Sequence, residues 1–223
     1  KKISLIFPRS DGTLWVQCED RTSTRQQFVY SLEIFDGSEF RLFDDRKDQW
    51  NIEQLRYIHE DTEGNIWLGG MAEERLGVYR DGKYRTLGEE YPGDSVMCIF
   101  PYDSRRLWFS DRNAIYEYDG EHWRTVHTHL DGIPSIVRRR DGSVWLATWN
   151  GLFRYDGNSW IENSVEEGLS SFCIFKIFED IQDRLWAATS MGLNLYHPEA
   201  DPDPPRVILD PSENGDTVAA NGV

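Results

Sequence analysis

The chain has 223 residues, and its 24 Lys and Arg stand against 39 Asp and Glu, which gives a formal net charge of −15 at pH 7. This charge repels phosphate backbones and anionic headgroups, so we expect no nucleic-acid partner and no direct membrane contact by this segment. Hydrophobic residues make up 39% of the chain and nine residues are Trp, so the composition supports a globular core. No apolar run approaches the roughly 18–20 residues of a membrane span.

The first predicted unit begins with an apolar run, Ile3–Pro8, that is typical of a β-strand. The phrase "DGTLWVQC" from Asp11 then predicts a turn followed by a strand around Trp15. An insertion of about ten residues, Arg21–Tyr30, precedes Phe35 and the turn Asp36-Gly37. An Asp-Gly pair between alternating apolar runs is a strong hairpin signal, so the unit is expected to hold four short strands.

The second and third units repeat this order of run, Trp strand and Asp-Gly turn. Their run, Trp and turn are Gln54–His59, Trp67 and Asp81-Gly82, then Ser95–Pro101, Trp108 and Asp119-Gly120. The fourth unit is written most clearly, as Ile133–Arg138, Ser143–Thr148, Leu152–Tyr155 and a last strand from Trp160. The fifth contains Phe172–Phe178, a strand around Trp186 and an aromatic at Tyr196.

The repeat has a measurable period. The five anchors are Trp15, Trp67, Trp108, Trp145 and Trp186, and their spacings are 52, 41, 37 and 41 residues. Removing the insertion of about ten residues brings the first spacing close to the others. A four-stranded unit repeated every 40 or so residues is the signature of a β-propeller blade. We therefore predict an all-β fold, a β-propeller with about five visible blades of a larger ring, in which the five Trp pack between successive sheets.

The last two units carry a resemblance to a known family. "LDGIPSIVRRRDGSVWLATWNGLFRYDG" and "EGLSSFCIFKIFEDIQDRLWAATSMGLNLY" resemble the two-component regulator propeller repeat. The second and third units match less closely, because Gly69-Gly70 and Phe109-Ser110 replace the small-Thr pair of that repeat. The resemblance extends over roughly residues 1–197.

In that family the propellers form the extracytoplasmic sensor of bacterial membrane signalling proteins, often hybrid histidine kinases, some of which respond to polysaccharide fragments. The resemblance implies a ligand-sensing or interaction module, not itself an enzyme, in the periplasm or outside the cell. It implies a glycan or other small molecule as ligand, with neighbouring domains of the same chain and a homodimer of the parent protein as further partners. Neither a cofactor nor a metal is expected.

The family usually closes with about seven blades, so we expect this chain to be an excerpt of a larger protein; a free-standing five-bladed ring is the alternative. Missing blades would leave apolar blade faces exposed. After the blades at 1–197, four Pro within eleven residues predict a stiff linker over residues 198–205. The resemblance implies that residues 206–223, which begin with "RVILD", open an Ig-like domain; an exit tail packing outside the ring is the alternative.

The candidate ligand-binding residues lie in the loops that follow each Trp strand and in those that join successive units. These loops share one end of every blade, which we call the loop face. Loops on a rigid scaffold commonly carry binding function, and aromatics mixed with amides suit sugars or small amphiphiles. The candidates are Trp149, Asn150, Arg112, Asn113, Met191, Trp50 and Glu73, and Tyr91 lies in the same set of loops. The competing interpretation is that Trp149 only caps the neighbouring blade.

The opposite end of each blade, the turn face, holds the turns between first and second and between third and fourth strands. Four of its five equivalent turns carry Arg, at positions 9, 105, 106, 138–140 and 184. An anion site is one interpretation, and ion pairing with the Asp-Gly turns on the same face is the stronger one.

Catalytic and metal chemistry find little support. His127, His129 and Asp131 alternate along one stretch without a fourth partner, and "DTEGN" from Asp61 lacks the downstream acid of a calcium loop. No serine elbow, phosphate loop or Cys/His pair is present, so we assign no catalytic residue. Two alternatives stay open: a lyase or hydrolase of the streptogramin lyase kind, for which only His59 lies near an inner strand, and a protein-docking scaffold.

Overall fold

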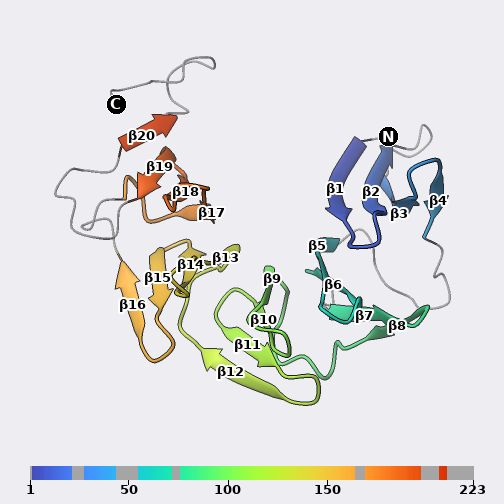
Figure 1. Cartoon of the computed structure of the whole chain (residues 1–223), viewed down its shortest axis with the longest axis horizontal. Coiled ribbons are helices and arrows are strands. Elements are labelled where there is room, and N and C mark those ends of the chain that lie inside the picture. Colours follow the sequence, from blue (N-terminus) through green and yellow to red (C-terminus); the bar gives the residue numbers. More distant parts are fainter. Residues whose placement is uncertain are drawn as a thin grey trace. The chain divides into compact units, whose positions relative to one another are not determined.

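The computed structural model describes residues 2–21, 28–43, 55–71, 76–163, 169–196 and 206–209. These residues form five four-stranded antiparallel sheets and their turns (Figure 1). The predicted fold class, an all-β β-propeller with five four-stranded blades, is confirmed. Within the described residues there is no helix with the length and apolar character that crossing a membrane requires.

Each blade is a meander of four successive strands. Blade 1 consists of β1 (Lys2–Pro8), β2 (Leu14–Arg21), β3 (Phe28–Phe35) and β4 (Phe40–Leu42). Blade 2 consists of β5 (Leu55–Glu60), β6 (Ile66–Gly70), β7 (Leu76–Arg80) and β8 (Lys83–Thr86). Blade 3 consists of β9 (Cys98–Pro101), β10 (Leu107–Ser110), β11 (Ile115–Tyr118) and β12 (Trp123–His127). Blade 4 consists of β13 (Ser135–Arg138), β14 (Val144–Thr148), β15 (Gly151–Tyr155) and β16 (Trp160–Asn163). Blade 5 consists of β17 (Ile174–Glu179), β18 (Leu185–Thr189), β19 (Gly192–Tyr196) and β20 (Arg206–Leu209).

The first strands of blades 3 to 5 start two or three residues later than the apolar runs predicted. In blade 3 the Val96 N–H donates to the Gly70 carbonyl of blade 2 at 2.9 Å, outside the ladder of its own sheet. The apolar run therefore continues beyond the strand because it also forms the link to the neighbouring blade. The predicted insertion extends the β2–β3 hairpin, whose register runs from Leu14↔Phe35 to Arg21↔Phe28.

The sequence left open whether Arg206–Leu209 begin an Ig-like domain or belong to an exit tail. These residues pair antiparallel with β19 as the fourth strand of blade 5. The blades therefore extend past the predicted boundary at residue 197 as far as this strand. The predicted linker at 198–205 and residues 210–223 lie outside the described residues, and a following Ig-like domain stays a prediction.

The chain divides into two compact units. One comprises residues 1–110 and 116–126, which hold blades 1, 2 and most of blade 3. The other comprises residues 111–115 and 127–223, which hold blades 4 and 5 and the loop that follows β10.

The Trp side chain and its two sequence neighbours point to opposite faces of the sheet, because side chains alternate along a strand. In blade 1, Trp15 is 1% exposed and packs with Leu32 against Ile66 and Leu68, the residues on either side of Trp67 in blade 2. One blade therefore buries its Trp face on the aliphatic face of the next.

The same arrangement recurs at two further junctions. Trp67 packs against Leu107 and Phe109, which flank Trp108 in blade 3. In the second unit Trp145 packs against Leu185 and Ala187, which flank Trp186 in blade 5. Trp108 is also buried, and its indole N–H donates to the Glu117 carboxylate at 2.9 Å.

Trp186 differs from the other four anchors. It is only half-buried and stacks on Phe178, at 6.1 Å between ring centroids. On the same strand as Phe178, Phe175 is 51% exposed. In the other unit, Ile3 and Ile6 of β1 are 55% and 57% exposed. The first and last blades thus each present an apolar surface that the inner junctions bury.

The β-turns on the turn face are closed by aspartates that accept backbone hydrogen bonds. Hydrogen bonds from the Ser38 hydroxyl and from the backbone N–H of Glu39 and Ser38 lower the pKa of Asp36 to about 2. The N–H groups of the two turn residues that follow likewise lower the pKa of Asp119 and of Asp156. This Asx geometry is the physical reason that Asp recurs in these turns.

A second device on the turn face links neighbouring blades, and we call it the arginine clamp. The Arg9 guanidinium of blade 1 donates to the Glu60 carboxylate of blade 2 at 2.9 Å, and the Ser10 N–H donates to the same carboxylate at 2.7 Å. In blade 4, Arg139 donates to Glu179 of blade 5 at 2.9 Å.

We expected these arginines to pair with the Asp-Gly turns of the same face, but Arg9 and Arg139 pair with glutamates of the next blade. The Arg139 and Glu179 side chains are 13% and 8% exposed, so the pair is largely removed from water. Arg106 and Arg184 instead bind the aspartates of their own turns, Asp103 and Asp180. These four arginines are therefore paired with acids, either in their own turn or across a junction.

Trp145→Ala should destabilise the protein by about 3–5 kcal/mol, because it removes a fully buried side chain and leaves a cavity. Trp186→Ala is the matched control and should cost clearly less, since its indole is half-exposed. Urea unfolding followed by far-UV circular dichroism measures both. Equal losses would show that the half-exposed Trp186 packs as tightly as Trp145.

Arg139→Met should destabilise the protein by about 3 kcal/mol, because it leaves the buried Glu179 carboxylate without its guanidinium. The control is Arg85→Met, whose ion pair with Glu90 has side chains 57% and 53% exposed. That change should stay within about 1 kcal/mol. Thermal and urea unfolding of the two variants should therefore separate; coincident curves would contradict the clamp as a stabilising contact.

Acid should destabilise the protein through the turn aspartates. Their pKa values are lower in the folded chain than the ordinary value of 3.8, so their contribution is present above that pH and is lost as the pH falls through the folded values. The urea midpoint should therefore drop steeply between about pH 4 and pH 2. A midpoint that stays constant over this range would argue against folded-state hydrogen bonds to these carboxylates.

Candidate functional site

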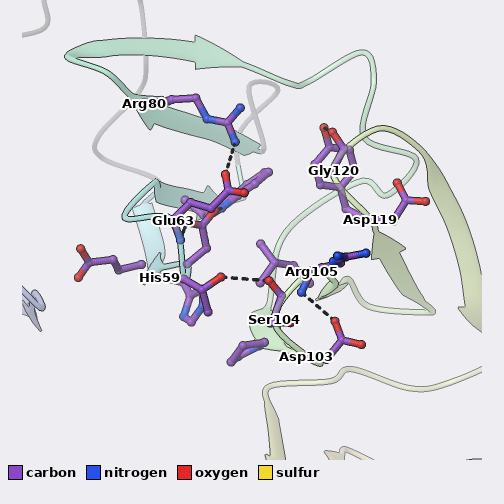
Figure 2. Close-up of a pocket in the computed structure, with 15 residues that line it drawn as sticks. His59, Glu63, Arg80, Asp103, Ser104, Arg105, Asp119 and Gly120 are labelled. Carbon is purple, nitrogen blue, oxygen red and sulfur yellow. Dashed lines mark hydrogen bonds and ion pairs between the residues drawn. The ribbon is translucent and has the colours of Figure 1, made fainter.

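A pocket of about 450 Å³ opens on the turn face between blades 2 and 3. Four turns form it: β5–β6 and β7–β8 of blade 2, and β9–β10 and β11–β12 of blade 3 (Figure 2). The lining combines apolar and aromatic residues, Trp67, Tyr118, Pro101 and Leu107, with charged and polar ones. Its volume lies within the roughly 300–1,000 Å³ that is usual for small-molecule sites.

The pocket lies at the junction where the arginine clamp is missing. The turns after the first strands are equivalent, because Arg9, Asp61 and Arg139 each donate their N–H to the carbonyl four residues later. Asp61 of blade 2 therefore stands where Arg9 and Arg139 stand. Pro101, the last residue of β9, stands where Glu60 ends β5 and Glu179 ends β17. Both partners of the clamp are absent, and a single side-chain hydrogen bond joins these turns instead, from the Thr62 hydroxyl to the Ser104 carbonyl at 3.0 Å.

Three of the wall carboxylates are saturated by hydrogen bonds. Asp61 accepts from the Trp67 indole N–H at 2.8 Å and from Asn65. Glu60 accepts from Arg9 and Ser10 on the far side of blade 2. Asp103 accepts from the N–H groups of its own turn and from the Arg106 guanidinium. These acids contribute charge to the pocket but little free hydrogen-bonding capacity.

The remaining polar groups have capacity to spare. Glu63 is 73% exposed and holds Arg80 at a long 3.4 Å. Asp119 uses one carboxylate oxygen to cap its turn. The His59 Nε2 atom is buried and has no hydrogen-bond partner, and burial lowers the pKa of this imidazole despite the acids of its own turn. His59 is therefore neutral at pH 7. Figure 2 shows Glu63 and Arg80 on the blade 2 side of the opening, and Asp119 and Arg105 on the blade 3 side.

His59 was identified from the sequence, but this pocket was not predicted. A signal for it was present in the spacing: "RSDGT" from Arg9 and "RRDGS" from Arg139 are each followed one blade later by Glu-Asp, at Glu60 and Glu179. The junction between blades 2 and 3 departs from this pattern on both sides. This departure from the pattern indicates a pocket only when the structure of the clamp is known.

The predicted loop-face residues lie along a row of bonded loops in the second unit. The Leu130 N–H donates to the Asn113 carbonyl at 3.0 Å, and the Gly132 N–H to the Arg112 carbonyl at 2.7 Å. The Trp149 N–H donates to the Asp131 carbonyl at 2.7 Å. These bonds join the loop after β10, the loop entering blade 4 and the loop after β14.

The row continues from blade 4 into blade 5. The Gly151 N–H donates to the Phe172 carbonyl at 2.7 Å, and the Ser190 N–H to the Cys173 carbonyl at 3.0 Å. Asn150 is exposed, and Met191 and Phe172 are 55% and 56% exposed. The backbone of the loop face is thus fixed by hydrogen bonds, while several of its side chains remain open to solvent.

Trp149 both packs and presents a surface. Its indole lies over Gly132, where a Cβ would come within 2.4 Å of the ring, and Gly132 also has a φ of +57°. Only glycine suits that position, because it tolerates the close ring and the left-handed backbone. The Arg112 guanidinium lies 5.8 Å from the centre of the indole. Trp149 is half-buried, so the expected cap and an available aromatic edge are both present.

The other candidates fall elsewhere. Trp50 and Glu73 lie outside the described residues. Tyr91 is a core residue rather than a surface one: it is 2% exposed, and its ring packs edge-on against Phe109 and Trp123. Its hydroxyl donates to the Ser95 carbonyl at 3.0 Å. Its place in a linking loop suggested exposure, but the linking segment folds back over the blade.

The histidine stretch shows packing rather than a ligand set. His127 stacks on Trp160 with 4.7 Å between ring centroids, and burial together with His129 lowers the pKa of His127. The Thr128 hydroxyl lies 2.8 Å from the His129 Nδ1 atom. In the part of the chain that the structure describes, no group of three His, Cys, Asp or Glu residues is arranged to hold a metal ion.

Comparison with known proteins supports the fold. No protein-family model matches the sequence, and no curated protein matches it. Among solved structures, the extracellular domain of the hybrid two-component system BT4673 from B. thetaiotaomicron is similar, with a TM-score of 0.70 and 16% identity over 90% of this chain. The extracellular domain of the hybrid two-component system BT3049 from the same organism has a TM-score of 0.57 and 17% identity over 91% of this chain.

An enzyme has a comparable structure. Virginiamycin B lyase from Staphylococcus aureus, solved with quinupristin, has a TM-score of 0.65 and 13% identity over 88% of this chain, and this chain covers 67% of it. The chain spans only 27% of the BT4673 structure and 34% of the BT3049 structure. At these identities the similarities establish the β-propeller fold that sensor domains and lyases share.

Proposed function

We propose that this chain is part of the extracytoplasmic sensor of a bacterial signalling protein and binds a small molecule or glycan on the loop face. The observation that carries the proposal is the row of hydrogen-bonded loops that holds Arg112, Asn113, Trp149, Asn150 and Met191. A fixed backbone that presents an aromatic edge, amides and a guanidinium is suited to polar ligands, because little conformational entropy is lost on binding.

The structural neighbours support the signalling class. Two of them are extracellular domains of hybrid two-component systems, and the same class was expected from the repeat. We place the chain outside the cytoplasm on the same grounds. The ligand would act by binding one packing arrangement of the propeller and its neighbouring domain more tightly than another, since only differential affinity shifts such an equilibrium.

The lyase alternative has one specific feature to weigh. His59 lines a pocket that also contains Glu60 and Asp61, as a proton-transfer site would require. Both carboxylates are already engaged by turn residues, however, and His127 stacks on Trp160 instead of lining this pocket. We therefore assign the chain no catalysis; turnover of a streptogramin or a lactone that His59→Ala abolishes would reverse this assignment.

The proposal predicts that the purified chain binds a member of a broad panel of oligosaccharides and small metabolites, measured by glycan array and calorimetry. Trp149→Ala and Met191→Ala should each weaken that binding, Trp149→Ala by about tenfold, which corresponds to about 1.4 kcal/mol of lost aromatic contact. Asn150→Ala should weaken it through a lost hydrogen bond.

The matched control is Phe40→Ala, which removes an aromatic that is 57% exposed on β4 of blade 1. It should leave the affinity unchanged. Met191 and Asn150 are exposed, so their variants separate a loss of binding from a loss of folding, which thermal unfolding checks independently. The absence of any ligand across the panel, or equal losses in the Phe40 control, would count against the loop face as a binding site.

A further inference from the structure

We propose that the pocket between blades 2 and 3 is a binding site for a small guanidinium compound, whose cation takes the place of the arginine that clamps blade 1 to blade 2 and blade 4 to blade 5. This site lies in the first unit and is separate from the loop-face residues of the second unit. It therefore stands or falls independently of the proposed sensing function.

The geometry of the turn face repeats from junction to junction. At the junction of blades 1 and 2, the Arg9 guanidinium bridges to Glu60 and lies 5.9 Å from the centre of the Trp15 ring. At the junction of blades 4 and 5, Arg139 bridges to Glu179. At the junction of blades 2 and 3 Asp61 replaces the arginine, Pro101 replaces the glutamate, and a pocket of about 450 Å³ is present. The position of the guanidinium is thus left without a protein cation, and a ligand there would use acceptors other than the clamp glutamate.

The charges that line the pocket also bear on its ligand. The lining contains five carboxylates and two guanidinium groups. Two of the carboxylates, Glu60 and Asp103, are paired with arginines outside the lining. This leaves three acids, Asp61, Glu63 and Asp119, against Arg80 and Arg105. The whole chain has a formal charge of −15, so the remaining excess of negative charge favours a cationic ligand over an anion.

Two carboxylates of the lining keep acceptor oxygens available. Glu63 is largely exposed and its contact with Arg80, at 3.4 Å, is one that a ligand can replace. An exposed pair of this kind contributes little stability, so its exchange costs little. Asp119 has a carboxylate oxygen that does not cap its turn. A guanidinium carries its N–H donors in a planar fork that suits carboxylate acceptors.

An aromatic side chain forms part of the wall. Tyr118 is half-buried, lines the pocket and has its hydroxyl turned to the Gly120 carbonyl at 2.7 Å. A guanidinium prefers the face of such a ring over water, because it is weakly hydrated and is attracted by the ring quadrupole. The lined volume suits a small molecule with one cationic head and a short apolar stem.

The test titrates the intact 223-residue chain with N-acetyl-L-arginine amide, and with the citrulline analogue as its neutral isostere. Calorimetry and the NMR signal of the Trp67 indole N–H, which is bonded to Asp61, report the binding. The arginine compound should bind with a dissociation constant on the order of 1 mM or below and the citrulline compound at least tenfold more weakly. Glu63→Gln and Asp119→Asn should each reduce the affinity about fivefold.

The control is Glu39→Gln, which removes an exposed carboxylate from the β3–β4 turn of blade 1 and should have no effect. Arg105→Gln should raise the affinity for the arginine compound, because it removes a guanidinium that repels the ligand. Three results would overturn the proposal: equal binding of the citrulline compound, equally tight binding of N-acetyl-L-lysine amide, or binding of propionate that Arg105→Gln abolishes, which would make the pocket an anion site. Thermal unfolding of each variant identifies any loss that comes from folding.

Discussion

The structure depends on one kind of contact, the burial of the Trp face of one blade on the aliphatic face of the next, which recurs at three junctions. Trp15, Trp67 and Trp145 are at most 3% exposed at the junctions that they form. A four-stranded sheet with two apolar faces is not stable alone in water, so each blade needs a neighbour on both sides. The turns, clamps and loops sit at the ends of these packed sheets and are positioned by them. The half-exposed Trp186 marks the place where this succession stops within the described residues.

The two ends of the blades are specialised in different ways. On the turn face, short Asx turns and arginine clamps hold neighbouring blades together through buried charge. On the loop face, backbone hydrogen bonds between successive loops do the same work and leave side chains such as Asn150 and Met191 exposed. The candidate pocket lies at a junction that has no arginine clamp. The candidate loop-face site lies where the bonded loops expose their side chains.

The repeated elements could be predicted from the sequence because their turn and strand signals are local. Asp-Gly turns, alternating apolar runs and the Trp period predicted the number of blades and most strand ends. The largest differences in strand ends were at the starts of the first strands of blades 3 to 5. There the apolar run continues into a link to the neighbouring blade, as the Val96 bond to Gly70 shows. Tyr91 was misplaced for the same reason, since a residue in a linking segment can be exposed or folded back, and its spacing alone does not distinguish the two.

The sequence by itself therefore determined the fold class, through the repeat of about 40 residues, and the turn chemistry and the separation of the two faces, through patterns within about ten residues. The tertiary structure decided which side chains meet across a junction. That Arg9 reaches Glu60, 51 residues later, and that Asp61 and Pro101 leave a pocket in the equivalent place, depends on how two sheets stack. Such contacts join residues about 40 or 50 positions apart, and no local pattern specifies them, because the geometry that unites them is set by the buried Trp faces.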